Sequence, residues 1–184
     1  MNELNILMRT PLNDDDLERF LGKEVNNNTL KYSDLENYND MNDLLPYNKS
    51  YKIILIEYEK NSGHWICFLR LNGIIEIFNS FGTKHDDDDF VDSDEMNNFL
   101  GQSHLFLNRL IEDELKDEEF IINYNKIKFQ IKSKNINTCG RHVVNRLICM
   151  MHYDMDLQDY INFMKNNKKK TKLNFDEIVT EIIS

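Results

Sequence analysis

The sequence lacks any apolar run that approaches the ~18 residues of a membrane-spanning helix. Its first residues, Met1 to Leu12, also lack the basic segment and apolar core of a secretion signal. There are only three cysteines, an odd number that does not suggest a disulfide framework. We therefore expect a protein of a reducing, intracellular compartment with no membrane partner, where a free thiol can persist and react.

Basic residues are also fewer than acidic ones, 22 Lys and Arg against 32 Asp and Glu, which gives a formal net charge of −10. An acidic chain is repelled by phosphate backbones, so broad nucleic-acid binding is disfavoured. The basic run from Lys165 to Lys172 can make a local contact, but a solvated loop between two helices is the simpler interpretation. The 184 residues show no internal repeat and no long linker, which predicts a single domain over residues 1–184.

Short stretches rich in β-branched and aromatic residues, separated by turn signals, predict an antiparallel meander. Its three strands are expected at Tyr51–Tyr58, His64–Leu71 and Ile74–Phe78, and two shorter strands at Phe120–Ile122 and Ile127–Ile131. Helices are expected at Asp14–Leu21, Ser33–Leu45, Met96–Leu115, Thr138–Tyr153, Leu157–Met164 and Phe175–Ile183, with a loop at Val25–Leu30. Strands that come before most of the helices indicate an α+β fold, with a central mixed or antiparallel sheet flanked by helices.

Cys139 is the candidate nucleophile. It lies in the segment NTCGRH (137–142), at the predicted start of an amphipathic helix. The partial positive charge of a helix N-terminus stabilises the thiolate relative to the thiol and so lowers the cysteine pKa. Gly140 removes a side chain beside the thiol and lets a substrate backbone approach. On position alone, a small buried residue at a helix start is an equally good interpretation.

Three further side chains complete the candidate site. His64 opens the second strand after a turn and is the candidate general base. Asn79 ends the third strand, where its amide oxygen is expected to accept the Nδ1–H of His64 and leave Nε2 for the thiol, as in a Cys-His-Asn triad. Gln130 is expected to donate an amide N–H to the developing oxyanion. Each residue taken singly also fits an ordinary structural role, so the prediction rests on the combination.

Four blocks of sequence together resemble the superfamily of ubiquitin-like-protein proteases and adenovirus-type maturation proteases. These blocks are GHW (63–65), FNSFG (78–82), Gln130 and TCGRH (138–142). They are most similar to the small cysteine proteases of virophages, large DNA viruses and Polinton-type elements. In that group a Gly-His-Trp strand, a Phe-Asp-Ser-aromatic-Gly segment and a Thr-Cys-Gly-Arg-His helix start recur. The blocks sample the span from Leu44 to Met151, most of the chain.

The resemblance implies a His–acid–Gln–Cys site and a cysteine endopeptidase that processes capsid or other virion precursors, often after small Gly-containing sequences. It places the enzyme in the host cytoplasm or virus factory, or packaged in the virion. Two features depart from the family. Asn79 stands where Asp or Glu is usual, so it can orient the ring without stabilising imidazolium by charge. The interval from Gln130 to Cys139 is longer than in the cellular deconjugating enzymes, so Asn135 and Asn137 are alternative oxyanion donors.

Substrate recognition is expected to use a groove that crosses the hairpin near Trp65. Because neighbouring strand residues alternate sides, Trp65 should pack on the face opposite His64. The acidic stretch Asp86–Asp89 can favour basic substrate segments, although a solvated loop is the simpler interpretation. We expect a monomer that acts on a polypeptide substrate and needs no cofactor and no metal.

Other functions remain open at this point. The pairs His64/Cys67 and Cys139/His142 have the spacing of zinc ligands, but residues three apart on a strand point to opposite faces. His142 is a rival base for Cys139, although a base on the same helical turn would crowd the substrate. An isopeptidase that removes ubiquitin or a related modifier from host proteins is the competing enzyme. A non-catalytic peptide-binding module is the alternative from a different class.

Overall fold

The structure, a computed structural model, describes residues 3–83, 94–102, 104–117 and 121–184. The acidic stretch Asp86–Asp89 lies outside these ranges. The strands are β1 (Thr29–Lys31), β2 (Tyr51–Glu59), β3 (Ser62–Leu71), β4 (Ile74–Phe78) and β5 (Ile121–Tyr124). The helices are α1 (Glu3–Arg9), α2 (Asp14–Leu21), α3 (Met41–Leu44), α4 (Asp94–Phe99), α5 (His104–Asp117), α6 (Cys139–Tyr153), α7 (Leu157–Thr171) and α8 (Phe175–Ile182), with 3-10 helices η1 (Lys23–Asn27) and η2 (Tyr32–Asn37).

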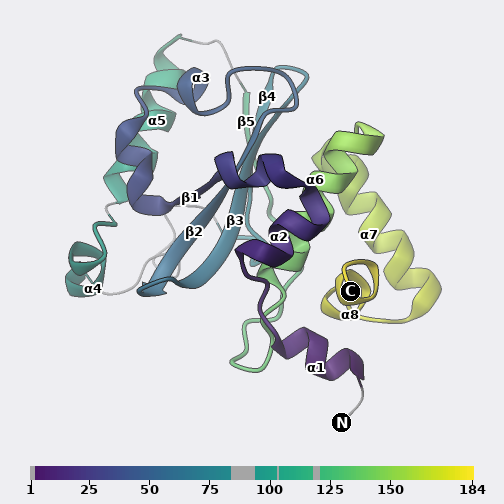
Figure 1. Cartoon of the computed structure of the whole chain (residues 1–184). Coiled ribbons are helices and arrows are strands. Elements are labelled where there is room, and N and C mark those ends of the chain that lie inside the picture. The colour runs from purple at the N-terminus through teal and green to yellow at the C-terminus, as the bar shows by residue number, and fades with distance from the viewer. Residues whose placement is uncertain (1–2, 84–93, 103, 118–120) are drawn as a thin grey trace.

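One mixed sheet in the order β1-β2-β3-β4-β5 forms the centre of the molecule (Figure 1). The predicted meander is confirmed, because β2, β3 and β4 pair antiparallel. The hairpin between β3 and β4 turns at Asn72 and Gly73, which both have positive φ, as a tight two-residue turn requires. The outer strands β1 and β5 pair parallel to their neighbours. The expected α+β fold, with a mixed sheet flanked by helices, is therefore present.

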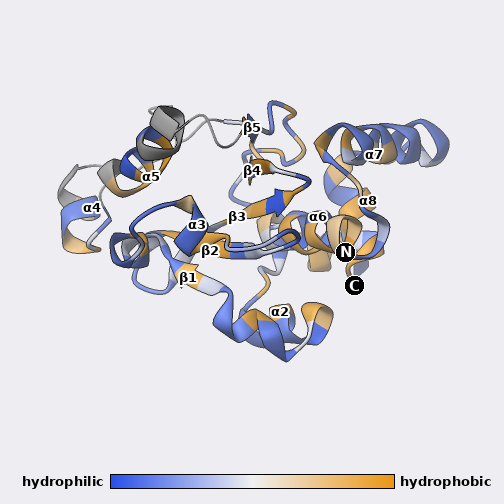
Figure 2. Ribbon diagram, turned by 90° about the horizontal axis from the view of Figure 1, so that it is seen from above, coloured by the Kyte–Doolittle hydropathy of each residue, from blue (hydrophilic) through white to orange (hydrophobic). Residues whose placement is uncertain are grey.

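The two faces of the sheet bury two separate cores. Successive side chains of β3 point to opposite faces, so this strand contributes to both. Trp65, Cys67 and Leu69 pack with α2, α6, α7 and α8, whereas Ile66 and Phe68 pack with η2, α3 and α5. Figures 1 and 2 show these two groups of helices on either side of the strands. The start of α6, where Cys139 lies, is thus held on the Trp65 face of the sheet.

A buried ion pair fixes α6 to the sheet. Arg146 donates from Nε and Nη2 to the two carboxylate oxygens of Glu76 on β4, at 2.8 and 2.6 Å. Both side chains are almost fully buried, and Arg146 also donates to the Met155 carbonyl. A two-pronged pair of this kind restricts orientation as well as distance. The helix that begins with Cys139 is therefore held in a defined orientation against β4.

Two predicted elements were wrong. The single helix expected at Met96–Leu115 is broken into α4 and α5, because Gly101 adopts a positive φ of 67° between them. The strand expected at Ile127–Ile131 is irregular, because the N–H groups of Phe129 and Gln130 both donate to the Ser80 carbonyl instead of alternating along a ladder. This irregular segment is the one that carries Gln130.

Three shorter predictions also need correction. The expected loop at Val25–Leu30 contains η1 and the start of β1, which pairs with β2. The helix expected at Ser33–Leu45 is divided into η2 and α3. The lysine run Lys165–Lys172 is no loop, because α7 continues to Thr171. Its lysines are solvent-exposed at the C-terminal end of α7, where positive charge is favourable.

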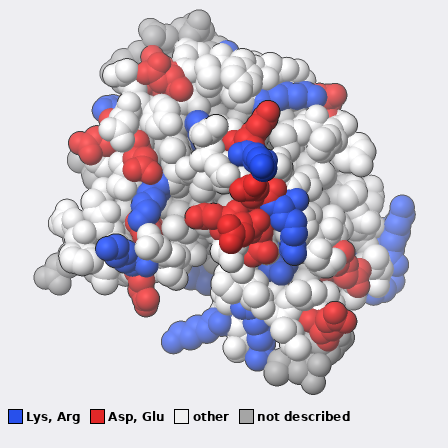
Figure 3. Space-filling model, in the orientation of Figure 1, with Lys and Arg blue, Asp and Glu red and all other residues white. Residues whose placement is uncertain are grey.

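The surface carries both signs of charge in spite of the net charge of −10. On the face shown in Figure 3, acidic and basic side chains are interspersed over the middle of the molecule. None of the helices within the described ranges has the length and apolarity that a bilayer crossing requires.

Candidate active site

Cys139 lies where the sequence predicted it, as the first residue of α6. Its side chain is buried, and this burial raises the pKa of the thiol. The backbone N–H groups of Trp65 and Gly140, and that of Cys139 itself, act in the opposite direction. Burial is the largest effect, so it favours the thiol over the thiolate in the resting protein.

His64 supplies an imidazole in the same region. Its ring is buried near the start of β3 and stacks on Phe81, with 4.3 Å between ring centroids and 11° between planes. Burial lowers the pKa of His64 to about 4, against the raising effect of its hydrogen bond to Asn79. The charges of His142 and Lys132 lower the pKa further. The ring is therefore neutral at physiological pH and able to accept a proton.

Asn79 determines which ring nitrogen of His64 carries the proton. Its Oδ1 lies 2.8 Å from His64 Nε2 and also accepts the Phe81 backbone N–H at 3.0 Å. Its Nδ2 donates to Thr83 Oγ1 at 2.8 Å. Because a backbone N–H can only donate, the oxygen of Asn79 must face both partners. In the neutral ring Nε2 is thus protonated and Nδ1 holds the lone pair.

The expected assignment of the two ring nitrogens was therefore wrong. We predicted that Asn79 would take Nδ1–H of His64, whereas the structure places Nε2 there. Nε2 is the nitrogen farther from the backbone, so it reaches across to the end of the neighbouring strand. The partnership of His64 with Asn79 is present, and Nδ1 is the ring nitrogen that Asn79 does not contact.

Substitutions of Asn79 test this arrangement. Asn79→Asp keeps an oxygen for His64 Nε2–H and adds a charge that stabilises imidazolium, so activity should be kept or raised. Asn79→Ala removes the acceptor and should lower kcat by about 10- to 100-fold. Steady-state peptide cleavage by both variants is the measurement. A large loss in Asn79→Asp would show that Asn79 does not orient the ring.

Gln130 presents its amide to the same region. Its Oε1 accepts the Ser80 hydroxyl at 2.8 Å, which leaves Nε2 as the group on the other side. One Nε2 hydrogen goes to the Ile136 carbonyl at 3.2 Å, and among the described residues no partner takes the second. An amide N–H held in this way can donate to an oxyanion. The alternative donor Asn137 also lines the cavity of Cys139 and Gln130, where its backbone N–H donates to the Met8 carbonyl and its side-chain amide to the Arg9 carbonyl.

One cavity of about 440 Å³ brings these groups together. His64, Gln130 and Cys139 all line it, and Asn79 lies behind the His64 ring. The other lining residues are Tyr58, Gly63, Phe81, Lys132, Ser133, Lys134, Ile136 and Asn137. The structure thus gathers the predicted nucleophile, base, orienting amide and oxyanion donor from segments that are far apart in the sequence.

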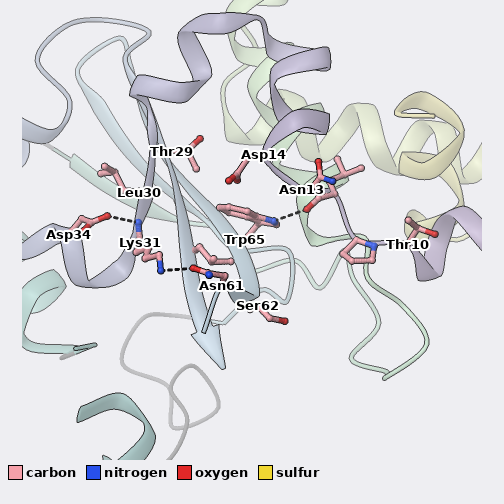
Figure 4. A pocket seen from close by; sticks show the side chains of 14 residues that line it. Thr10, Asn13, Asp14, Thr29, Leu30, Lys31, Asp34, Asn61, Ser62 and Trp65 are labelled. Atoms are coloured by element: carbon pink, nitrogen blue, oxygen red, sulfur yellow. Dashed lines mark hydrogen bonds between the residues drawn. The ribbon is translucent and has the colours of Figure 1, made fainter. Parts of the chain in front are cut away.

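A larger cavity of about 750 Å³ adjoins the first, since Gly63 lines both. Trp65 forms part of its wall (Figure 4), and the expectation that substrate binds in a groove near Trp65 stays a prediction. The indole N–H donates to the Leu12 carbonyl at 3.1 Å, and the side chain is only 7% exposed. Trp65 therefore packs in the core with one part of its side chain and lines the larger cavity with another.

Two glycines near the site are closely packed by their neighbours. A Cβ on Gly140 would lie 3.0 Å from Leu12 Cβ and 3.3 Å from Trp65 Cδ1, so these side chains would have to shift by a few tenths of an ångström. A Cβ on Gly63 would lie 1.9 Å from the Ile56 carbonyl oxygen. Packing therefore explains both glycines, and the expected contact of Gly140 with substrate remains a prediction.

His142, the rival base, has a different partner. Its Nε2 lies 3.2 Å from Asp176 Oδ1, and the ring is fully buried away from the cavity that Cys139 lines. Only Nε2 is engaged in this contact, and Nδ1 of the same ring has no hydrogen-bond partner among the described residues. Over the described parts of the chain, no three side chains of His, Cys, Asp or Glu converge as metal ligands would.

Three contributors to the site were missed by sequence reasoning. Phe81 stacks on His64, Ser80 donates to Gln130 and Asp176 contacts the first turn of α6. Phe81 and Ser80 lie in the FNSFG block, so the signal was available there. Asp176 stands far along the chain in the first turn of a helix, where an acidic residue is ordinary.

Comparison with known proteins finds a viral relative. No family model matches the sequence. Protein V9 of Sputnik virophage, which is described as uncharacterized, is 32% identical over 185 residues, covering 99% of each chain. The chain belongs to the V9 family. A viral relative of this kind agrees with the resemblance to virophage proteins seen in the sequence.

The fold of this V9-family chain is also similar to that of a solved structure. It is the SUMO protease Ulp1 with its catalytic cysteine oxidized to a sulfinic acid. The match covers 98% of this chain and 83% of that chain, with 16% sequence identity and a TM-score of 0.45.

Proposed function

We propose that this V9-family chain is a cysteine endopeptidase that processes capsid or other virion precursor proteins, with Cys139 as nucleophile and His64 as general base. One observation carries the proposal: a thiol at a helix start, an imidazole with a fixed tautomer and the amide of Gln130 share one cavity. The virophage relative supports a viral role. We propose further that the enzyme acts as a monomer, without cofactor, inside the host cell or the virion.

The arrangement supports a two-stage reaction. As the sulfur of Cys139 attacks the scissile carbonyl carbon, its proton passes to Nδ1 of His64. Backbone N–H groups at the start of α6 and Nε2 of Gln130 donate to the oxyanion. Protonated His64 then gives its proton to the leaving amine, and a thioester remains. Water attacks the thioester with His64 again as base, releasing the acid product and the thiol.

In the first step, the proton of the Cys139 thiol passes to His64 while the sulfur attacks the substrate carbonyl. Burial raises the pKa of the Cys139 thiol and lowers that of His64, so the resting pair is neutral on both sides. Asn79 orients the ring without a negative charge that would favour imidazolium. These effects favour deprotonation of the thiol during the reaction over an ion pair that forms before substrate arrives.

An extended polypeptide is the substrate class that suits the two adjoining cavities. They meet at Gly63 beside the base, so a chain that crosses there can occupy both. Lys132 and Lys134 line the cavity of Cys139, which makes this wall positive. A positive wall does not itself favour basic substrate segments. The preference for basic segments that Asp86–Asp89 suggested stays a prediction, because those residues lie outside the described ranges.

Cleavage assays with two substrates test the proposed function. The purified chain is incubated with virion precursor fragments that contain Gly-rich junctions, and in parallel with a ubiquitin-like modifier that carries a C-terminal extension. We expect faster cleavage of the precursor. Cleavage of the modifier alone would favour the isopeptidase. Absence of cleavage, together with absence of reaction with a thiol-directed electrophile, would favour a non-catalytic binding module.

A further inference from the structure

We infer that Asp176 is a positioning residue of this site, whose buried carboxylate holds the start of α6 and the segment of Gln130 at the spacing that two oxyanion donors require. This inference rests on the proposed function. Asp176 lies in the first turn of α8, 37 residues after Cys139 in the sequence, and its side chain is fully buried. It lies outside both cavities, so it acts through its neighbours.

One oxygen of Asp176 binds the helical turn that begins with the nucleophile. Oδ1 accepts the Thr138 hydroxyl at 2.5 Å and lies 3.2 Å from His142 Nε2. Thr138 directly precedes Cys139, and His142 follows it by about one turn. Both partners are fully buried, as is the carboxylate. Asp176 therefore contacts the first turn of α6 on both sides of Cys139.

Thr138 also leaves the N–H groups of this turn without a hydrogen bond to an N-cap side chain. A threonine at a helix N-cap normally accepts a first-turn N–H with its own side chain. Thr138 makes no such bond within the part of the chain that the structure describes, and its hydroxyl is directed to Asp176. The N–H of Gly140, at the second position of the helix, is one that such a bond could have taken, so it stays available. The N–H groups of Gly140 and of Cys139, which no N-cap bond would engage, can both serve the thiol and a developing oxyanion.

The second oxygen of Asp176 binds the segment that carries the other donor. Oδ2 accepts the backbone N–H of Ile131 at 3.0 Å, and Ile131 follows Gln130. Residues 131–135 between the two donors are exposed, so the connecting chain does not hold them together tightly. A direct link through Asp176 does so. Across the long interval from Gln130 to Cys139, Asp176 thus adds a link from Ile131 to Thr138 beside the bond from Gln130 Nε2 to the Ile136 carbonyl.

A purely structural role is the alternative, and energetic coupling separates the two. We would measure kcat and KM for Asp176→Asn in the wild-type and in a Gln130→Ala background. Asn keeps the shape but replaces one accepting oxygen with a donor. We expect kcat to fall about 10-fold or more with KM changed less than about 3-fold. In the Gln130→Ala background the fall should be less than about 3-fold, because the donor that Asp176 positions is already absent.

Two more variants keep the test decisive. Thr180→Ala removes a buried hydroxyl from the same helix, bonded to the Asp176 carbonyl, and contacts neither α6 nor Ile131 through that group. It should lower the melting temperature while kcat stays within about 2-fold. Thr138→Val removes one of the three bonds to the carboxylate, so it should lower kcat by a smaller factor, with the same dependence on Gln130.

Equal losses from Asp176→Asn in both backgrounds would overturn the inference, as would an unchanged kcat. If Asp176→Asn does not fold, Thr138→Val decides in its place by the same comparison. A wild-type protein that cleaves nothing, or a Gln130→Ala protein with full activity, would instead contradict the proposed function. The two failures are therefore distinguishable.

Discussion

Replacing Cys139 with alanine should abolish peptide cleavage, with a fall in kcat/KM of at least about 10⁴-fold. The variant has no atom that can form the thioester, so oxyanion donors and binding alone remain. The change removes one sulfur at the start of α6 and leaves the Glu76–Arg146 pair untouched. Circular dichroism and thermal unfolding should therefore be close to those of the wild type.

Cys149 provides a matched control for this prediction. It lies on the same helix and is also buried, and burial raises the pKa of its thiol to about 11. It belongs to the core and lines neither cavity of the site. Cys149→Ala should keep kcat/KM within about 2-fold. Cleavage by Cys139→Ala at the wild-type rate would show that another group carries the reaction.

Acid should destabilise the fold through His64. The pKa of the buried ring is about 4, below the value of about 6.5 for an unfolded histidine. Between these two values the unfolded chain binds a proton that the native state does not, so stability falls as the pH is lowered. The free energy of unfolding should fall by about 3 kcal/mol from this residue between pH 7 and pH 4. Burial also lowers the pKa of His142, which adds a loss in the same direction.

Urea unfolding at several pH values isolates this effect when His64→Gln is compared with the wild type. Gln is neutral throughout the range and keeps an amide N–H that can reach Asn79. The variant should lose less stability on acidification, by about 3 kcal/mol at pH 4. Identical acid sensitivity in the two proteins would mean that His64 is not buried as a neutral ring.

The sequence predicted the parts of the fold that depend on local pattern. The strands around Trp65 carried strong β propensity, and the Asn72-Gly73 turn set their pairing. The apolar spacing of residues 138–153 placed α6 correctly. The outer strands β1 and β5 were harder, because strands of three or four residues depend on their neighbours for stability.

The candidate site was predictable as a set of residues and less so as a geometry. The positions of Cys139 and His64 followed from a helix start and a strand start. The choice between Nδ1 and Nε2 could not follow, since it depends on side-chain directions across two strands. The connection through Asp176 could not follow either, because tertiary packing alone buries that carboxylate beside Thr138.

The central claim is that the thiol of Cys139 is the group that His64 activates, and an electrophilic peptide probe ending in glycine tests it most directly. The wild-type protein is treated with the probe, digested and mapped by mass spectrometry, in parallel with His64→Gln. We predict modification of Cys139, with Cys67 and Cys149 untouched, and much slower labelling without the imidazole. Modification of another cysteine, or labelling of Cys139 at the same rate in both proteins, would contradict the account.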